Sequence, residues 1–491
     1  MTIIANKENI FNPKSWGLPK EAIDGLAERL HNVWSRFHNL FRTKRKNTSE
    51  HAYVYMQGLL TMDTERNYAN IARRVNSIED DGQNLQQFMS DSPWEAKPVF
   101  QKIQSDVLQR PELAGGVLIL DESADERSGN KSAGASRQYL GRFGKVDMGQ
   151  VGVVLGYTID GLWMMLDTRI YLPKNWFTRS YSWLWQKLHI PANIRFQTKQ
   201  KLGLEMILNT QVNFEAIVFD SFYGNDHWFR IRLDRNQKLY MGEIRNHIKV
   251  YLHRPVIGVP PNSTIRHRGR PFSRRRVVSN EKPISVTETI QHMQFRSVTV
   301  RHSERGLLKF FCAALRVWII TKEGYMIEEW LFVRREPDGT YKFALSNASA
   351  DTPLEKLAYW QASRYFIERT IQDAKSEAGW DELVAQKYRA WMHHAALVAL
   401  TLWFIAQTKL DWKQQFPRDS SLSLQMDLDV LPSLSMANIR ELLKAVLPLK
   451  QLSPTLARRL VVKHLVARSR SISSRLKACR SQNVVNVYLQ I

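Results

Sequence analysis

Cysteine is scarce in this chain of 491 residues, which contains only Cys312 and Cys479. Two cysteines so far apart cannot supply a disulfide framework or a zinc site built from cysteine pairs. Long apolar runs are also lacking. The longest, residues 395–406, is shorter than the roughly 20 residues that span a bilayer and predicts a buried helix. Residues 1–12 lack the apolar core of a secretory signal, so we expect a cytoplasmic protein with no membrane partner.

Acidic residues are few beside basic ones, because 47 Asp and Glu against 70 Lys and Arg give a formal net charge of +23. The hydrophobic content of 44% is that of a globular chain, and the length predicts about three domains. Such a charge indicates a polyanionic partner, with nucleic acid the first candidate. Basic residues gather at residues 42–46, 266–276 and 458–480. One cluster alone is as readily a solvated surface, but three clusters favour a long nucleic-acid-binding surface.

Helical patterns come first in the chain and strand patterns follow. Apolar residues repeat at helical spacing over residues 21–41, and residues 63–89 fit either a helix-turn-helix unit or a plain helical bundle. Helices are also expected at residues 197–210 and 226–233, and strands at 116–120, 150–157, 162–171, 215–219 and 239–244. Residues 158–161 predict a hairpin turn. A hairpin-linked trio of strands followed by alternating helices and strands predicts a mixed α/β sheet in the order of the ribonuclease-H-like fold.

The second half of the chain interrupts this order. Residues 246–350 are basic and β-like, with strands expected near 298–300, 317–321 and 329–334. A long helix is then expected from about residue 353 to 377. Two further helices are candidates for contacts between copies of the chain, at residues 431–447 and 453–466.

Two aspartates, Asp121 and Asp220, directly follow predicted buried strands. Sites in sheets with α/β connections lie at strand ends, so these side chains would be neighbours if their strands are adjacent. Adjacent carboxylates raise each other's pKa unless a cation lies between them, and Mg²⁺ prefers carboxylate oxygen. With a third carboxylate, two ions could activate an attacking hydroxyl and stabilise the leaving oxygen of a phosphodiester. Either aspartate alone could instead end a strand or cap a helix.

Glu368 is the candidate for the third carboxylate. Arg364 lies four residues before it and Lys375 seven residues after it, so the three project from one helical stripe. An acid for a metal ion flanked by cations for phosphate suits a DNA-cutting helix. The alternative is a salt-bridged surface helix, and the competing acids on spacing alone are Glu355, Glu377 and Glu382.

The glycine-rich segment after Asp121 carries Lys131, Arg137 and Lys145, which could bind phosphates or belong to a flexible basic hairpin. This segment lacks the GxxxxGK[ST] pattern of a nucleotide-binding loop, so we predict no ATP use. The 13 histidines form no metal pattern. The pair His393-His394 is expected to pack within its apolar helix.

Several separated motifs occur in a recognisable order. They are LILDES at 118–123, KSAG at 131–134, RQYLG at 137–141, QVGV at 150–153, YLP at 171–173, FQTK at 196–199, FDSFYG at 219–224 and LSNA at 345–348. With them, residues 55–410 resemble the catalytic domain of DDE insertion-sequence transposases, in particular the insertion-sequence family numbered seven hundred and one. Such enzymes cut at transposon ends and join the freed 3′-hydroxyls to target DNA.

The resemblance implies roles for individual residues. Asp121, Asp220 and Glu368 correspond to the metal-binding D, D and E, which would hold two Mg²⁺ ions with Mn²⁺ as a substitute. Arg364, Glu368 and Lys375 match the R, E and K of the Y-x2-R-x3-E-x6-K signature of related transposases, where Arg and Lys contact DNA. The tyrosine position is Gln361 here, which puts hairpin handling in doubt. The adjacent Trp360 could stack on a DNA base instead.

The implied organisation has five parts. These are a helical DNA-binding region (1–110), a ribonuclease-H-like catalytic domain in two parts (111–245 and 351–410), a β-rich insertion that contacts DNA (246–350) and a basic helical C-terminal region (411–491). We expect a bacterial, nucleoid-associated protein that acts on double-stranded DNA, both transposon ends and target, as a homodimer in the synaptic complex. The alternatives are a domesticated, non-catalytic DNA-binding protein with the same fold and a general ribonuclease-H-like nuclease.

Overall fold

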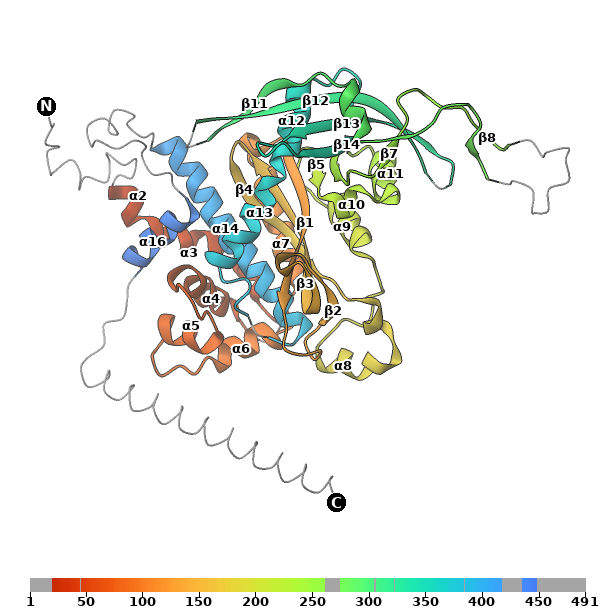
Figure 1. The fold of residues 1–491 in the computed structure, drawn as a ribbon. Coiled ribbons are helices and arrows are strands. Elements are labelled where there is room, and N and C mark those ends of the chain that lie inside the picture. Colours follow the sequence, from red (N-terminus) through yellow and green to blue (C-terminus); the bar gives the residue numbers. More distant parts are fainter. Residues whose placement is uncertain are drawn as a thin grey trace, which may run out of the picture.

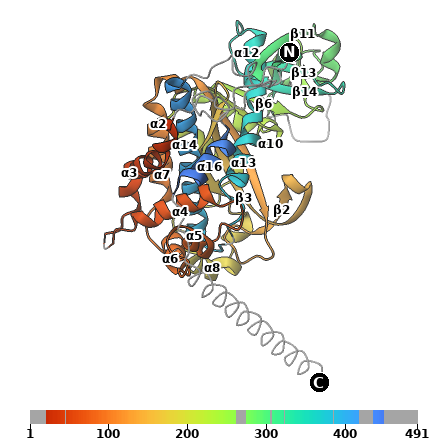
Figure 2. The ribbon, with the colours of Figure 1, turned by 90° about the vertical axis from the view of Figure 1, so that its left-hand side faces the viewer.

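The computed structural model describes residues 20–44, 46–260, 274–303, 306–321, 323–383, 385–416 and 435–447. In this part of the chain, helices flank one large mixed sheet (Figures 1 and 2). The predicted α/β class is therefore confirmed.

The sheet has ten strands within the described residues, in the order β11-β12-β13-β14-β6-β5-β1-β3-β2, with β4 also paired to β3. β1, β5 and β6 are parallel, whereas β3 runs antiparallel to both β1 and β4. The order β4-β3-β1-β5-β6 is consistent with a ribonuclease-H-like domain. The strands of this region are β1 (Gly116–Glu126), β2 (Ser136–Leu140), β3 (Lys145–Ile159), β4 (Leu162–Ile170), β5 (Phe214–Phe219) and β6 (Tyr240–Ile244).

The β3–β4 hairpin turns where the sequence predicts. Asp160 and Gly161 have φ angles of 47° and 76°, as a two-residue hairpin loop requires. Two glycines of β3 then allow helices to lie close to the sheet. A Cβ atom at Gly156 would lie 2.7 Å from Ile367 of α13 (Tyr365–Ser376), and one at Gly152 would lie 2.9 Å from Trp391 of α14 (Tyr388–Gln415).

Successive side chains of β1 point to opposite faces of the sheet. Ile119 pairs with Gly156 and therefore faces α13, whereas Leu120 packs against Gly203 of α9 (Lys199–Leu208). Asp121 consequently lies on the same face as α13. Three more helices contact the sheet, α10 (Ser221–Gly224), α11 (His227–Arg235) and α12 (Leu354–Ser363), while α8 (Ser182–Lys187) packs on the preceding 3₁₀ turn. The predicted helices at 197–210 and 226–233 are thus confirmed as α9 and α11.

The N-terminal helices pack around α14, whose residues 395–406 are fully buried as predicted (Figure 1). The helix expected at 21–41 is present as α2, α3 and a 3₁₀ turn, His38–Phe41. Residues 63–89 contain two eight-residue helices joined by residues 76–82. None of the helices in the described residues combines the length and hydropathy of a membrane span. The helices are α2 (Lys20–Asp24), α3 (Leu26–Phe37), α4 (Ser49–Thr61), α5 (Tyr68–Val75), α6 (Gln83–Ser90) and α7 (Ala96–Leu108).

The strands after residue 245 continue the same sheet, because β14 pairs with β6. They are β11 (Arg296–Ser303), β12 (Gly306–Ile320), β13 (Met326–Arg335) and β14 (Tyr341–Ser346). The first three overlap the predicted strands, whereas β14 was not predicted. Nine buried side chains, including Val317 and Leu331, form a second small core here. The short strands β7 (Lys249–Val250), β8 (Ile257–Gly258), β9 (Arg276–Val277) and β10 (Ile284–Ser285) lie before them, and β8 with β9 forms an arm that stands out from the body (Figure 1).

Three local expectations were wrong in detail. β1 does not end before Asp121, because β3 pairs with it as far as Glu126. The glycine-rich segment contains a strand, β2, that also pairs with β3. The long helix expected at 353–377 is divided at Arg364. Around that residue the backbone bonds join residues three apart, from the Arg364 amide to Gln361 and from the Ile367 amide to Arg364, instead of four apart.

The C-terminal region is described only in part. Helix α16 (Met436–Val446) lies within the helix expected at 431–447. The helix expected at 453–466, the basic cluster at 458–480 and most of the cluster at 266–276 lie outside the described residues.

Candidate active site

Asp121 and Asp220 meet where the parallel pairing of β1 and β5 ends. The last paired residues are Leu120 and Phe219, so the two aspartates come next on neighbouring strands. β1 continues beyond Asp121 along β3, whereas the chain after Phe219 leaves the sheet and starts α10. Backbone pairing therefore sets the positions of both aspartates.

Asp220 also caps a helix. Its Oδ1 accepts hydrogen bonds from the backbone amides of Phe222 at 3.1 Å and Tyr223 at 3.4 Å, at the start of α10. The same oxygen makes both bonds. The sequence left a cap and a metal ligand as alternatives for this aspartate, and the geometry lets one side chain serve as both.

Burial disfavours the charged form of both aspartates. Burial, together with the nearby charge of Asp220, raises the pKa of Asp121 to about 7. Burial also raises the pKa of Asp220, although the amides of Tyr223 and Phe222 act in the opposite direction. A bound cation would favour the charged form of both groups.

Arg364 links Glu368 to this edge of the sheet. Its guanidinium lies 2.8 Å from the Glu368 carboxylate, 3.0 Å from Glu243 and 3.8 Å from Asp121. Burial lowers the pKa of Arg364, but these three acids outweigh it and the net pKa is raised. The Glu368 side chain is 55% exposed, against 22% for Asp121. Glu368 thus stands at the open side of the site.

Glu243 is a site residue that the sequence reasoning missed. It lies on β6, one position after Gly242, which pairs with Phe219, and so is level with Asp220. Its charge contributes to the raised pKa of Asp220. The signal was available, because Glu243 is the penultimate residue of a predicted strand next to that of Asp220.

The structure separates Glu368 from the three competing glutamates. Each of the others pairs with an arginine away from the two aspartates. Glu355 lies 3.1 Å from Arg296 and Glu377 lies 2.7 Å from Arg440, whereas Glu382 pairs with Arg66. Only Glu368 among these four shares a partner with Asp121.

The residues at the signature's tyrosine position are buried. Gln361 donates to Glu243 at 2.9 Å and accepts from Arg334 at 2.8 Å. Trp360 is 3% exposed and its indole N–H donates to Glu215 at 3.3 Å. The structure therefore does not present Trp360 to a DNA base, contrary to the expectation that it could stack there. Tyr365, 45% exposed, is the accessible aromatic residue on this helix pair.

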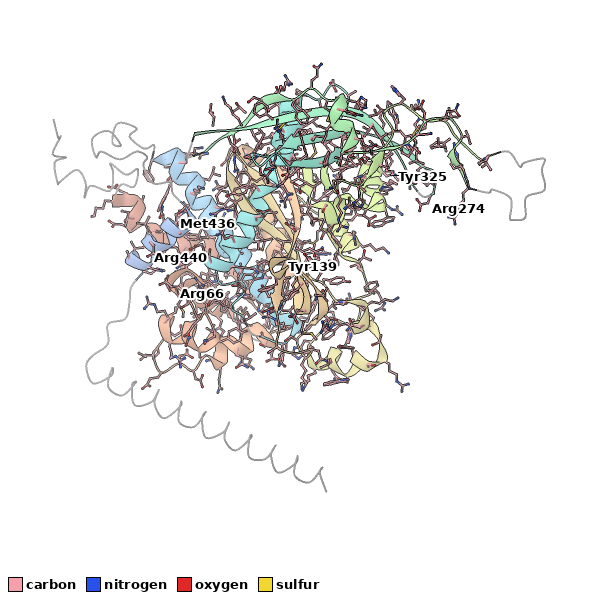
Figure 3. All side chains as sticks on the ribbon, in the orientation of Figure 1. Arg66, Tyr139, Arg274, Tyr325, Met436 and Arg440 are labelled. Atoms are coloured by element: carbon pink, nitrogen blue, oxygen red, sulfur yellow. The ribbon has the colours of Figure 1, made fainter. Side chains whose placement is uncertain are left out.

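The other predicted DNA-binding residues lie apart from the carboxylates. Lys375 reaches Asp125 near the end of β1 at 2.6 Å, and both side chains are mostly buried. Lys131 and Arg137 are exposed, as is Lys145, which pairs with Asp147 at 2.7 Å and Glu126 at 3.2 Å. These three cations surround the β2–β3 hairpin, where Figure 3 labels the exposed Tyr139.

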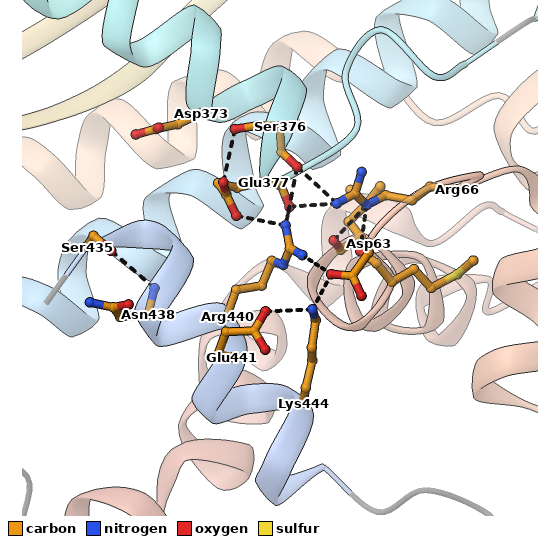
Figure 4. A network of polar contacts seen from close by, with 12 residues as sticks. Asp63, Arg66, Asp373, Ser376, Glu377, Ser435, Asn438, Arg440, Glu441 and Lys444 are labelled. Carbon is orange, nitrogen blue, oxygen red and sulfur yellow. Dashed lines mark hydrogen bonds and ion pairs between the residues drawn. The ribbon is translucent and has the colours of Figure 1, made fainter.

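The far end of the helix that carries Glu368 is held by two arginines (Figure 4). Arg440 of α16 donates to the Glu377 carboxylate at 2.7 Å and to the Ser376 carbonyl at 3.2 Å, and Arg66 donates to that carbonyl at 3.1 Å. Arg440 also pairs with Asp63, between α4 and α5. Cations at a helix C-terminus are favourable. The end of α13 is thus tied to both the N-terminal helices and α16.

The two histidines on α14 pack as expected. The His394 ring lies 2.9 Å from the Tyr55 hydroxyl and 3.2 Å from the Trp380 carbonyl, and burial lowers its pKa to about 4. His393 is stacked on Trp94 with ring centroids 3.6 Å apart.

A divalent metal ion suits the donors at the sheet edge. Asp121, Asp220 and Glu368 offer only carboxylate oxygens, the ligands that Mg²⁺ prefers. A bound cation would offset the burial that raises the pKa of Asp121 and of Asp220. Among the described residues, no three Asp, Glu, His or Cys side chains lie close enough together to form a metal-binding group. Arg364 instead supplies the cation between Asp121 and Glu368.

Comparison with known proteins decides the family. Residues 36–307, more than half of the chain, match the family described as DDE superfamily endonuclease. The chain belongs to the DDE superfamily of endonucleases. It is also similar to a protein of Microchaete diplosiphon named "Probable transposase for insertion sequence element IS701", with 24% identity over 315 residues, 63% of this chain and 70% of that protein.

The family membership makes this protein an enzyme, an endonuclease of the DDE superfamily. Endonucleases of this superfamily are metal-dependent, in agreement with the carboxylate oxygens at the sheet edge. The family match includes Asp121 and Asp220 but ends before Glu368. The role of Glu368 therefore rests on its contacts with Arg364.

Proposed function

We propose that this protein is a transposase, which binds the ends of a transposable element, hydrolyses phosphodiester bonds there with Asp121, Asp220 and Glu368, and joins the freed 3′-hydroxyls to target DNA. One observation carries the proposal. The two aspartates lie on adjacent parallel strands, and Arg364 ties Glu368 to the same edge.

The three carboxylates would hold two Mg²⁺ ions, with Mn²⁺ as a substitute, which would activate the attacking oxygen and neutralise the leaving one. Asp121 and Asp220 must be deprotonated for this, and Asp220 keeps its orientation through its bonds to α10. Arg364 offers a guanidinium for a phosphate oxygen, and Glu243 holds it in place when Glu368 turns towards the aspartates. Water and a 3′-hydroxyl differ only as nucleophiles, so one site can serve cleavage and joining.

We further propose that two copies act together, because joining requires both element ends to be brought to one target. The N-terminal region (1–110) and the segment 246–350 would bind DNA on either side of the catalytic parts (111–245 and 351–410). The proposed role of the basic C-terminal region (411–491) falls mostly outside the described residues. The net charge of +23 supports an extended DNA contact. Retention of all three acids speaks against a domesticated, non-catalytic protein.

Cleavage of a supercoiled plasmid carrying the element's ends, in Mg²⁺ or Mn²⁺, tests the proposal. We expect the unchanged protein to cut at the ends, and Asp121→Asn to bind the ends without cutting. Glu355→Gln is the matched control, because Glu355 is an exposed acid on the neighbouring helix, paired with Arg296. Cutting by Asp121→Asn at the unchanged rate, or cutting with no preference for the ends, would refute it.

A further inference from the structure

A groove of about 940 Å³ runs from the candidate active site along α13 to α16. It begins at Glu243, Arg364 and Glu368 and continues between the β11–β12 strands, α14 and the first residues of α16. At its far end, Arg440 of α16 bonds the last residue of α13 and Glu377 (Figure 4). Six cations line the groove, namely Arg301, Arg334, Lys342, Arg364, Arg369 and Lys409.

The acids that line the groove are already paired. Glu243 and Glu368 contact Arg364, and Glu377 contacts Arg440. Asp373 lies 3.5 Å from Arg369 and accepts a hydrogen bond from Trp163. Arg334 is paired outside the lining, with Glu336 at 2.6 Å. The six cations of the groove still outnumber its four acids together with Glu336.

Arg301 on β11 lines the groove without an acid partner among the described residues. Its guanidinium lies over the rings of Tyr365 at 4.8 Å and Phe366 at 4.6 Å, and no ion pair joins it to any described residue. Its Nε is buried without a hydrogen-bond partner in that part of the chain. Burial lowers the pKa of Arg301. A half-buried guanidinium with an unmet donor suits an anionic partner such as a phosphate.

We propose that this groove binds the phosphodiester backbone of the DNA strand that continues from the scissile phosphate, with Arg301 as its anchoring phosphate contact. This inference rests on the proposed function and adds a path for one strand. The groove shares Glu368 with the candidate active site, so a strand held there enters the site directly. Tyr365 and Phe366 fix the plane of the guanidinium, which leaves its edge for phosphate oxygens.

Binding of the element's terminal-repeat duplex to the full chain tests the groove. Arg301→Gln should weaken binding about tenfold or more, as loss of a hydrogen bond to a charged group predicts. It should also reduce the slope of log K against log salt by about 1. Arg316→Gln is the matched control, because Arg316 on β12 also stacks on an aromatic ring, Trp330, but is paired with Glu328 and lies outside the groove.

A second measurement locates the phosphate. Duplexes that carry one uncharged methylphosphonate at successive positions beside the cut should bind the unchanged protein less tightly at one or two positions. Arg301→Gln should lose no further affinity at those positions, since the contact is already gone. Lys342→Gln, at an exposed groove position, repeats the salt test on a variant with little risk to folding.

An unchanged affinity and salt slope in both variants would overturn the inference. So would a melting temperature of Arg301→Gln that changes while DNA binding does not, because the groove would then be covered by this chain or a second copy. Failure of the proposed function is separate, since the unchanged protein would then not cut the element's ends at all.

Discussion

The two sides of the candidate site are built differently. Asp121 and Asp220 stand on adjacent strands whose register is set by backbone hydrogen bonds, and neither needs a neighbouring side chain to be in place. Glu368 stands on a helix, is 55% exposed, and reaches the aspartates only through Arg364. Gly156 beneath that helix lets Ile367 pack closely on the sheet, and Arg66 and Arg440 form hydrogen bonds to the end of the helix.

The difference shows which parts of the site are fixed and which can move. A one-residue shift of a strand would turn its aspartate to the opposite face, so the sheet allows the aspartates little freedom. A helix held by side-chain contacts can shift by small amounts without unfolding. The aspartates therefore form the rigid half of the proposed site, and Glu368 forms its movable half.

The largest effect should follow from neutralising the rigid half. Asp220→Asn keeps the helix cap, because Asn caps as well as Asp, but removes the charge. We expect end cleavage to fall on the order of 10³-fold, since a metal ion contributes several kcal/mol to the transition state. Single-turnover cleavage and melting temperature should be measured together. A variant that cuts normally with normal stability would remove Asp220 from the site.

A smaller loss should follow from loosening the link between the two halves. Glu243→Gln removes the acid that holds Arg364 at 3.0 Å without touching the aspartates or Glu368. We expect a 10- to 100-fold loss of cleavage, roughly what loss of an outer partner of a metal site costs, with a higher Mg²⁺ requirement. Glu215→Gln is the control, because Glu215 is a strand glutamate paired with Lys356 away from the site. An unchanged Mg²⁺ requirement would contradict the role of Glu243.

A local effect should follow from releasing the far end of α13. Arg440→Gln removes the contacts to Glu377 and Ser376, so amide hydrogen exchange at the end of α13 should rise about tenfold while β1 and β5 stay protected. Lys444→Gln is matched, because Lys444 lies on the same helix but pairs with Asp63 and Glu441. Equal changes in the strands and in α13 would show that the two halves are not independent.

The smallest effect near neutral pH is on the free energy of unfolding and comes from His394, a residue of α14 that contacts Tyr55 of the N-terminal helices. Its pKa is lowered by burial to about 4, whereas an unfolded histidine titrates near its ordinary value of 6.5. Between these values the unfolded state binds more protons, so the free energy of unfolding should fall by roughly 3 kcal/mol as pH drops from 6.5 to 4. Urea unfolding at several pH values should show a shallower decline for His394→Gln. Identical declines would exclude this histidine as the cause.

Much of the rigid half could be predicted from the sequence. The apolar runs before Asp121 and Asp220 identified their strands. The adjacency of those strands was a condition in the sequence analysis, and the structure meets it. The turn at Asp160 and Gly161 was also readable from local sequence. These features depend on a few consecutive residues and on general rules of sheet topology.

The movable half was harder to predict because its contacts join distant parts of the chain. Spacing placed Arg364 and Glu368 on one stripe, but the break at Arg364 and its contact with Glu243, 121 positions earlier, come only from tertiary packing. The burial of Trp360 against Glu215 likewise has no local signal. Arg440 holds the end of α13 from a separate helix. The sequence predicted that helix, at residues 431–447, but as a candidate for contacts between copies of the chain.

The central claim is that Asp121, Asp220 and Glu368 hold the same metal ions. Replacing Mg²⁺ by Fe²⁺ and generating hydroxyl radicals at the bound metal, with end DNA present, would cut the polypeptide close to the ion. We predict cuts near residues 121, 220 and 368 in one sample, all suppressed by excess Mg²⁺ and lost in Asp121→Asn. Cuts near the two aspartates but never near Glu368, or cuts only elsewhere in the chain, would contradict the account.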